Sequence, residues 1–211
     1  MKSKLPEPDS YRCQSCVGGD AAKPLEQKHL LLKDGSELEC VSKFCYLGDM
    51  LGMGGGAEEA SRVRVKCAWG KFLDLAPILT TKGASLKLKG KLYRACVQSV
   101  MAYGSETWAV KLEDTHRLER NEMMMVRWMC GVTLKDRRSN LELLQRLGIV
   151  GIAEVVRHGR LRWFGHVERK DAGDWVSLSR NFVVESQRGT GRGRKTFNEC
   201  VVDDMKRLKL S

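Results

Sequence analysis

The residues of this chain with the clearest chemical potential are cations, and one group of them lies in the middle of the sequence. The stretch from 75 to 105 contains no acidic residue and five basic ones, Lys82, Lys87, Lys89, Lys91 and Arg94. Lys87, Lys91 and Arg94 are spaced i, i+4, i+7, which places them on one face of a helix. Such a one-sided row matches the regular row of phosphates along a nucleic-acid backbone. The alternative is a solvated helix face, but the absence of balancing acids favours binding.

A second group of cations alternates with aromatic residues in the segment Arg157-His-Gly-Arg-Leu-Arg-Trp-Phe-Gly-His166. A guanidinium group binds phosphate through two parallel hydrogen bonds, so Arg157, Arg160 and Arg162 are predicted to contact nucleic acid. Its aromatic side chains could stack on bases, but we favour a place in the core for them. The two histidines lie eight residues apart, two turns along a helix, and are not interpreted as a metal-binding pair.

A third group of cations is interspersed with glycine in the segment Arg188-Gly-Thr-Gly-Arg-Gly-Arg-Lys195. Glycine lets the backbone lie against phosphates while the cationic side chains supply charge. The predicted binding residues are Arg188, Arg192, Arg194 and Lys195. Flexible linkers often have a similar composition, so a plain linker is the alternative interpretation.

Two cysteines near the N-terminus have the spacing of zinc ligands. Cys13 and Cys16 form a C-x-x-C pair, and Cys40, Cys45 or His29 could complete a tetrahedral set. Their spacing does not match a standard second pair of ligands, and one such pair seldom holds structural zinc alone. We therefore expect no cofactor, and Cys13 and Cys16 are weak candidate ligands should zinc be bound.

The sequence lacks the common signatures of catalysis. It contains no G-x-S-x-G, P-loop or H-E-x-x-H motif. Asp203-Asp204 is the one adjacent aspartate pair, in a segment with the pattern of an amphipathic helix. Because two-metal phosphoryl transfer needs carboxylates that converge from several elements, we interpret this pair as a solvated helix face and predict no catalytic residue.

Net charge indicates the class of partner. The chain carries +11, but residues 1–50 have seven basic and eight acidic side chains, so residues 51–211 carry +12. This excess favours nucleic acid as the partner; anionic membrane and a merely soluble basic protein are the alternatives. No segment has the roughly 20 apolar residues of a membrane span, and the polar N-terminus is not a secretory signal. We expect a reducing intracellular location, in the nucleus or cytoplasm.

Hydrophobic periodicity predicts the elements that position these residues. Two strands, 28–33 and 38–48, flank an Asp-Gly turn at 33–36. From residue 57 the period becomes helical. The predicted helices cover about 57–76, 86–102, 112–130, 139–147, 151–169 and 196–209. The buried side of the second helix is assigned to Leu88, Leu92, Cys96, Val100 and Tyr103, and that of the third to Leu118, Met125, Val126 and Met129.

The predicted fold is mainly α, a helical bundle with a short N-terminal β-hairpin and a flexible basic C-terminal tail. Four regions are expected: a flexible segment at 1–25, the hairpin at 26–56, a helical domain at 57–175, and a basic linker with a tail helix at 176–211. In the helical domain we expect four tryptophans to be largely buried, Trp69, Trp108, Trp128 and Trp163.

Several segments, in this order, resemble the region that follows the catalytic palm in non-LTR retrotransposon reverse transcriptases. These segments are Phe44-Cys-Tyr-Leu-Gly48, Lys89-Gly-Lys-Leu-Tyr93, Tyr103-Gly-Ser-Glu-Thr-Trp108, Met125-Val-Arg-Trp-Met-Cys130, Leu161-Arg-Trp-Phe-Gly-His-Val167 and Lys195-Thr-Phe197. The resemblance covers about residues 11–210. It implies a primer-grip strand pair around Phe44–Gly48, followed by thumb-like helices.

The resemblance also indicates which parts of the family's machinery are missing. The family's catalytic aspartates, including the aromatic-Ala-Asp-Asp turn, do not occur in the sequence. Cys13 and Cys16 resemble the last pair of a zinc module whose earlier ligands would lie upstream. The implied function is therefore binding of RNA, DNA or their hybrid, with a palm-bearing polypeptide as a second partner, and not polymerase activity by this chain alone. A zinc-containing or helical protein-interaction module, or an element remnant without selected function, are the alternatives.

Overall fold

The computed structural model describes residues 29–31, 35–52, 57–181 and 195–209, and most of them are helical. The helices are α1 (Glu58–Leu79), α2 (Leu86–Tyr93), α3 (Ser99–Ala102), α4 (Leu112–Cys130), α5 (Asn140–Leu147), α6 (Ile152–Glu168), α7 (Trp175–Asn181) and α8 (Phe197–Arg207). A π-helical turn, η3 (Arg94–Gln98), joins α2 to α3, and the short 3-10 turns are η4 (Ser105–Thr107) and η5 (Leu134–Asp136). The predicted mainly α fold is confirmed.

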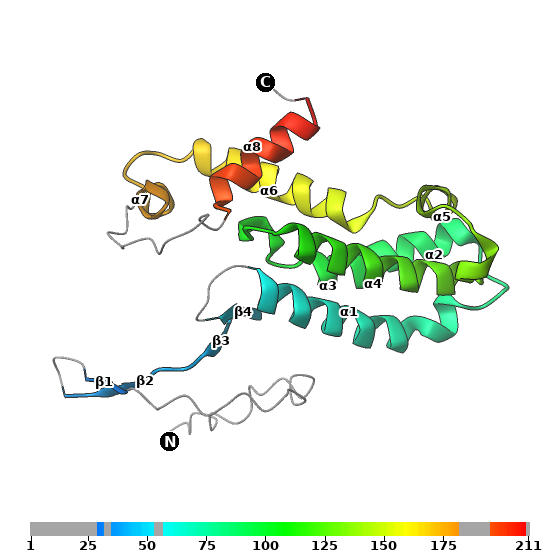
Figure 1. Ribbon diagram of the computed structural model, residues 1–211, viewed down its shortest axis with the longest axis horizontal. Coiled ribbons are helices and arrows are strands. Elements are labelled where there is room, and N and C mark those ends of the chain that lie inside the picture. The colour runs from blue at the N-terminus through cyan, green and yellow to red at the C-terminus, as the bar shows by residue number, and fades with distance from the viewer. Residues whose placement is uncertain (1–28, 32–34, 53–56, 182–194, 210–211) are drawn as a thin grey trace, which may run out of the picture.

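Two antiparallel hairpins precede the helices (Figure 1). The first pairs β1 (His29–Leu31) with β2 (Glu37–Glu39), as the Asp-Gly signal predicted. The second pairs β3 (Lys43–Tyr46) with β4 (Asp49–Gly52). The strand predicted over 38–48 is therefore wrong in its extent. It is interrupted after β2 and ends at a tight turn, where Leu47 and Gly48 both have positive φ (48° and 78°), as a type I′ turn requires.

Helix ends follow local capping chemistry. The hydroxyl oxygen of Ser85 accepts a hydrogen bond from the Leu88 amide at the start of α2. Thr196 and Glu199 form a reciprocal capping box at the start of α8. Gly148 ends α5 in the left-handed conformation that glycine adopts without steric cost. Here the sequence predicted the boundaries closely, whereas α7 was not predicted at all.

The second predicted helix is present, but its buried side is not the one assigned from sequence. The π turn of η3 adds a residue to one turn and thereby rotates the helical residues after it. Tyr93, Val97 and Met101 face the core with no exposed area, whereas Leu88 and Tyr103 are more than half exposed. Leu88 and Tyr93 both precede η3, so within α2 the apolar pattern indicated the wrong side; after η3 the π turn breaks the regular 3.6-residue repeat that the pattern assumes.

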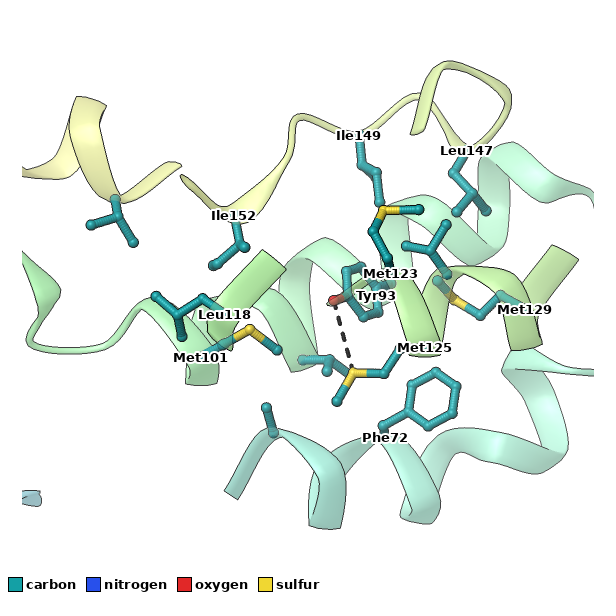
Figure 2. Packing of buried hydrophobic residues seen from close by; sticks show 14 of the residues in the cluster. Phe72, Tyr93, Met101, Leu118, Met123, Met125, Met129, Leu147, Ile149 and Ile152 are labelled. Carbon is teal, nitrogen blue, oxygen red and sulfur yellow. Dashed lines mark hydrogen bonds between the residues drawn. The ribbon is translucent and has the colours of Figure 1, made fainter. Parts of the chain in front are cut away.

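The core forms where α1, α2 and its π extension, α4, α5 and the start of α6 meet (Figure 2). Phe72 of α1 and the predicted α4 stripe of Leu118, Met125, Val126 and Met129 are all fully buried, or nearly so. At the centre, the Tyr93 hydroxyl donates a weak hydrogen bond to the Met125 sulfur at 3.9 Å. This packing holds α2 against α4 and α5, and so fixes the face that α2 presents to solvent.

The four tryptophans are less uniformly buried than predicted. Trp108 is 5% exposed, Trp69 and Trp163 are half-buried, and Trp128 is 48% exposed. The Trp128 ring still contacts the buried Phe72 ring, with centroids 5.4 Å apart. A tryptophan is large enough to contribute one edge to a core while its remainder stays at the surface, which the sequence pattern does not reveal.

Polar contacts dock the second hairpin onto the helices. Arg64 of α1 donates a hydrogen bond to the Gly48 carbonyl oxygen, and its guanidinium lies 4.2 Å from the centre of the Tyr103 ring. The Tyr103 hydroxyl donates to the Leu47 carbonyl oxygen at 3.0 Å, and the Trp108 indole donates to the Asp49 carboxylate at 3.1 Å. The Tyr103–Trp108 motif thus positions the β3–β4 turn.

Candidate nucleic-acid interface

The exposed side of α2 and η3 carries three of the predicted cations. Lys87, Lys91 and Arg94 are all exposed. Within the described part of the chain, none of the three makes an ion pair. The i, i+4, i+7 row is therefore exposed to solvent, and its role in binding stays a prediction. Lys82, in the turn before α2, is exposed as well.

Lys89 does not belong to this surface. It is 5% exposed, and its ammonium group donates a hydrogen bond to the Met129 carbonyl oxygen at 3.2 Å, near the end of α4. Cations at a helix C-terminus are stabilised by the partial negative charge of the unpaired carbonyls there. Lys89 therefore ties α2 to α4, and its prediction as a phosphate-binding residue is corrected by this buried position.

The arginines of α6 occupy three different environments. Arg162 is exposed, Arg157 is half-buried and Arg160 is 4% exposed. Arg160 donates a hydrogen bond to the Asp204 carboxylate of α8 at 2.5 Å, and Arg157 lies 3.9 Å from the same carboxylate. Arg160 is thus not open to a phosphate in this structure, because an acidic residue of the same chain occupies its guanidinium.

This contact corrects the interpretation of the aspartate pair. Asp204 is 5% exposed and lies in the α6–α8 interface. Asp203 is partly exposed and pairs with Lys195, whose nitrogen is 2.6 Å away. Only Asp203 therefore fits the predicted solvated face. Lys195, also predicted to bind nucleic acid, is exposed but carries this ion pair.

The tertiary structure brings together two cations from different predicted groups. Arg94 of η3 and Arg162 of α6 line the same cavity of about 290 Å³, together with Gln98, Ser99 and His158. A concave site with two guanidinium groups and further polar side chains has the chemistry to hold an oxyanion. We refer to Lys87, Lys91, Arg94 and Arg162 as the α2–α6 basic face.

A buried carboxyl group holds the two sides of this cavity together. Glu122 of α4 accepts a hydrogen bond from the Gln98 side chain at 2.8 Å and another from the Ile152 backbone amide at 2.7 Å. Gln98 also donates to the Val150 carbonyl oxygen at 2.7 Å. Burial is the main cause that raises the pKa of Glu122 to about 7, against the opposing effect of these hydrogen bonds.

Sequence reasoning missed Glu122 and Gln98. Glu122 lies between Leu118 and Met125 on the buried side of α4, and Gln98 is buried next to Val97 in η3. A carboxyl group in an apolar helical stripe is itself a signal, because such a group needs partners when it is buried. The missing information was the identity of those partners, which come from η3 and from the start of α6.

The aromatic residues of the α6 segment lie outside the cavity that Arg94 and Arg162 line. Trp163 and Phe164 are half-buried and line a separate cavity of about 420 Å³ between α6, α7 and α8. The guanidinium of Arg180 lies 5.0 Å from the centre of the Phe164 ring. Trp163 and Phe164 therefore lie at the boundary between α6, α7 and α8 and not in the central core.

Several predicted site residues lie outside the described residues. These are Arg188, Arg192, Arg194, Cys13 and Cys16. In the described part of the chain, no group of three or more His, Cys, Asp or Glu side chains is placed to hold a metal ion. None of the helices described here is long and apolar enough to cross a membrane.

Comparisons with known proteins give one informative result. No family model and no solved structure matches the chain. Over 149 residues the chain is 26% identical to a putative uncharacterized transposon-derived protein of Caenorhabditis elegans, an alignment that covers 68% of this chain and 52% of that protein. The chain thus spans about half the length of this relative. The similarity supports a transposon origin for the chain.

Proposed function

We propose that the chain binds the phosphate backbone of nucleic acid through the α2–α6 basic face, without sequence preference. The observation that carries this proposal is the meeting of Arg94 and Arg162 at one cavity of about 290 Å³. These residues are far apart in sequence, and neither makes an ion pair within the described residues. Like charges repel, so their convergence favours a site that an anion neutralises.

The same proposal extends to origin. We propose that the chain derives from a retrotransposon RNA-directed DNA polymerase and lacks the catalytic palm. The transposon-derived relative supports the first part. The motif order from Phe44–Gly48 to Lys195–Phe197 supports the polymerase as the source. The docking of the β3–β4 turn by Tyr103 and Trp108 is consistent with a strand pair that the following helices hold in place.

Salt dependence tests the binding proposal. If the α2–α6 basic face neutralises three phosphates, with Arg94 and Arg162 sharing one, or four, the slope of log K against log salt should be about −3 to −4 on duplex, from −0.9 per contact. Changing Lys87, Lys91 and Arg94 together to Gln should reduce this slope by about 2 to 3. The measurement is titration of labelled duplex, hybrid and single-stranded oligonucleotides at several salt concentrations.

A matched control separates specific contacts from total charge. Lys111, Arg120 and Lys135 are exposed cations in or beside α4 and η5, and changing them to Gln removes the same charge. This second triple variant should retain most of the slope. Equal losses in the two triple variants would mean that the charge acts only as a whole, and negligible binding by the unmodified chain would end the proposal.

A further inference from the structure

Helix α8 places an acidic residue on the arginines of α6. The Asp204 carboxylate accepts a hydrogen bond from Arg160 at 2.5 Å through one oxygen, and its other oxygen lies 3.9 Å from the Arg157 guanidinium. Arg160 and Asp204 are 4% and 5% exposed. One carboxylate is therefore shared by two guanidinium groups, an arrangement that a phosphate group would satisfy with more oxygen atoms and more charge.

The carboxylate does not satisfy this site fully. The Arg160 Nε is buried and has no hydrogen-bond partner. Next to it lies a cavity of about 290 Å³ whose lining includes Arg157, Arg160, Lys195 and Arg207 as well as Asp203 and Asp204. Four cations thus face these two carboxylates, and Arg157 also pairs with Glu154 of its own helix at 3.6 Å. A buried guanidinium group with an unpartnered nitrogen, in a cavity with excess positive charge, can accept a further anionic oxygen as a hydrogen-bond partner.

The element that covers the site is small. α8 contains 11 residues and buries few apolar side chains against its neighbours, chiefly Cys200 and Val201 at 1% and 2% exposure. The Cys200 thiol donates a weak hydrogen bond to the Val110 carbonyl oxygen at 3.8 Å. Elements with little apolar burial open at lower free-energy cost than the core, so α8 can leave while the rest of the fold persists.

We propose that the Asp204 carboxylate occupies a phosphate-binding site on α6. A nucleic-acid backbone competes with this carboxylate for Arg157 and Arg160 and so releases α8. This inference rests on the proposed function, since the competitor is the nucleic acid that binds the α2–α6 basic face. The site is a second one, because Arg162 lies about 200° around the α6 helix from Arg160, at 100° per residue. Arg157 and Arg160 then form a second set of phosphate contacts, which α8 covers until nucleic acid binds.

The first test compares two variants of the full chain that remove one negative charge each. Asp204→Asn keeps a hydrogen-bond acceptor beside Arg160 but removes the charge that competes with phosphate. Asp74→Asn removes the same charge from an exposed position of α1. We expect Asp204→Asn to tighten duplex binding about tenfold at a fixed salt concentration, because the phosphate then displaces no carboxylate, and Asp74→Asn to change it by less than about threefold. Adding Arg157→Gln to Asp204→Asn should reverse about half of that gain.

The second test follows α8 directly in the unmodified chain. Alkylation of Cys200, quantified by peptide-resolved mass spectrometry, should accelerate when oligonucleotide is added, because release of α8 exposes the buried thiol. Cys67 of α1, which is half-buried, should react at the same rate with and without oligonucleotide. Inorganic phosphate in place of oligonucleotide distinguishes a free anion from a polynucleotide, and acceleration by phosphate alone would overturn the polynucleotide as the competitor.

The outcomes separate the inference from the proposed function. Binding that depends on Lys87, Lys91 and Arg94, with equal affinities for Asp204→Asn and Asp74→Asn and no change at Cys200, would overturn only the inference. Binding by Asp204→Asn but not by the unmodified chain would overturn both, because nucleic acid would then neither bind the α2–α6 basic face nor displace Asp204. Absence of binding by both would overturn both proposals.

Discussion

The two cation-rich helical regions of this protein look alike in sequence and differ in the folded chain. On α2 and η3, Lys87, Lys91 and Arg94 remain exposed. On α6, Arg160 is buried under Asp204, a residue 44 positions away. The acid-free stretch around α2 leaves its cations without a nearby counter-ion, whereas α8 supplies one to α6. Charge spacing therefore predicts a face, but tertiary contacts decide whether that face is available.

We expect the largest difference between the two regions when the buried Asp204 carboxylate is removed. Asp204→Ala should lower the free energy of unfolding by at most about 3–5 kcal/mol, the cost of a buried guanidinium without a counter-ion, because release of α8 exposes Arg160 and limits the loss. Lys91→Ala, on the exposed face, should change it by no more than about 0.5 kcal/mol. Urea denaturation of both variants measures the difference. Similar values would show that the α6–α8 contact contributes no more than a surface pair.

A pH dependence should arise at the joint between the two regions. Glu122 contacts Gln98 of η3 and Ile152 of α6, and its pKa rises from 4.5 to about 7 on folding. A carboxyl group with a raised folded-state pKa binds its proton more tightly in the native state. Its stabilising contribution is complete below pH 4.5 and is lost as the pH rises through about 7. The loss should approach about 3 kcal/mol.

Urea denaturation at pH 5 and pH 8 measures this effect in a window where the exposed carboxylates stay ionised. The pKa values of Glu58, Asp136, Asp174 and Asp203 are lowered by their own partners, chiefly through hydrogen bonds, so these groups act at lower pH. Glu122→Gln should remove most of the difference between the two pH values. A variant that keeps the full difference would assign it to another group.

A glycine substitution should test the close packing of α2 against α5. A Cβ atom at Gly90 would lie 2.0 Å from the Leu147 carbonyl oxygen, so Gly90→Ala should force α2 and α5 apart and destabilise the fold by about 1–3 kcal/mol. Gly70 in α1 has nothing within 4 Å of the same position. Gly70→Ala should therefore stabilise the fold, by about 0.5–1 kcal/mol. Thermal unfolding of both variants compares them directly.

The smallest expected effect concerns how Arg94 and Arg162 share their cavity. If one phosphate contacts both side chains, Arg94→Gln and Arg162→Gln should each reduce the salt slope by up to about 1 unit, from 0.9 per contact. The double variant should then lose little more than either single variant, because residues that share a partner are not additive. Lys87→Gln combined with Arg162→Gln should give additive losses. Additivity for both pairs would indicate two separate phosphate contacts.

The fold was largely accessible from the sequence where local signals and tertiary packing agree. The third predicted helix, 112–130, has the same bounds as α4, and its four assigned apolar residues are buried. α5 ends at Leu147, the last residue of the predicted helix 139–147. The agreement fails in α2, where Tyr93 and not Leu88 faces the core, and after η3, where the π turn rotates the residues that follow. A π turn depends on packing against other helices and has no periodicity of its own in the sequence.

For the candidate interface, the sequence by itself determined the supply of positive charge and the exposed row of Lys87, Lys91 and Arg94, because helical spacing and the lack of local acids are properties of the chain. Only the tertiary structure decided that Arg162 joins this row at a cavity, that Lys89 ties α2 to α4, and that Asp204 covers Arg160. The physical reason is that these outcomes depend on which charges meet across helix interfaces. A pair of opposite charges gains its strength from close approach and burial, and both are set by the packing of elements distant in sequence.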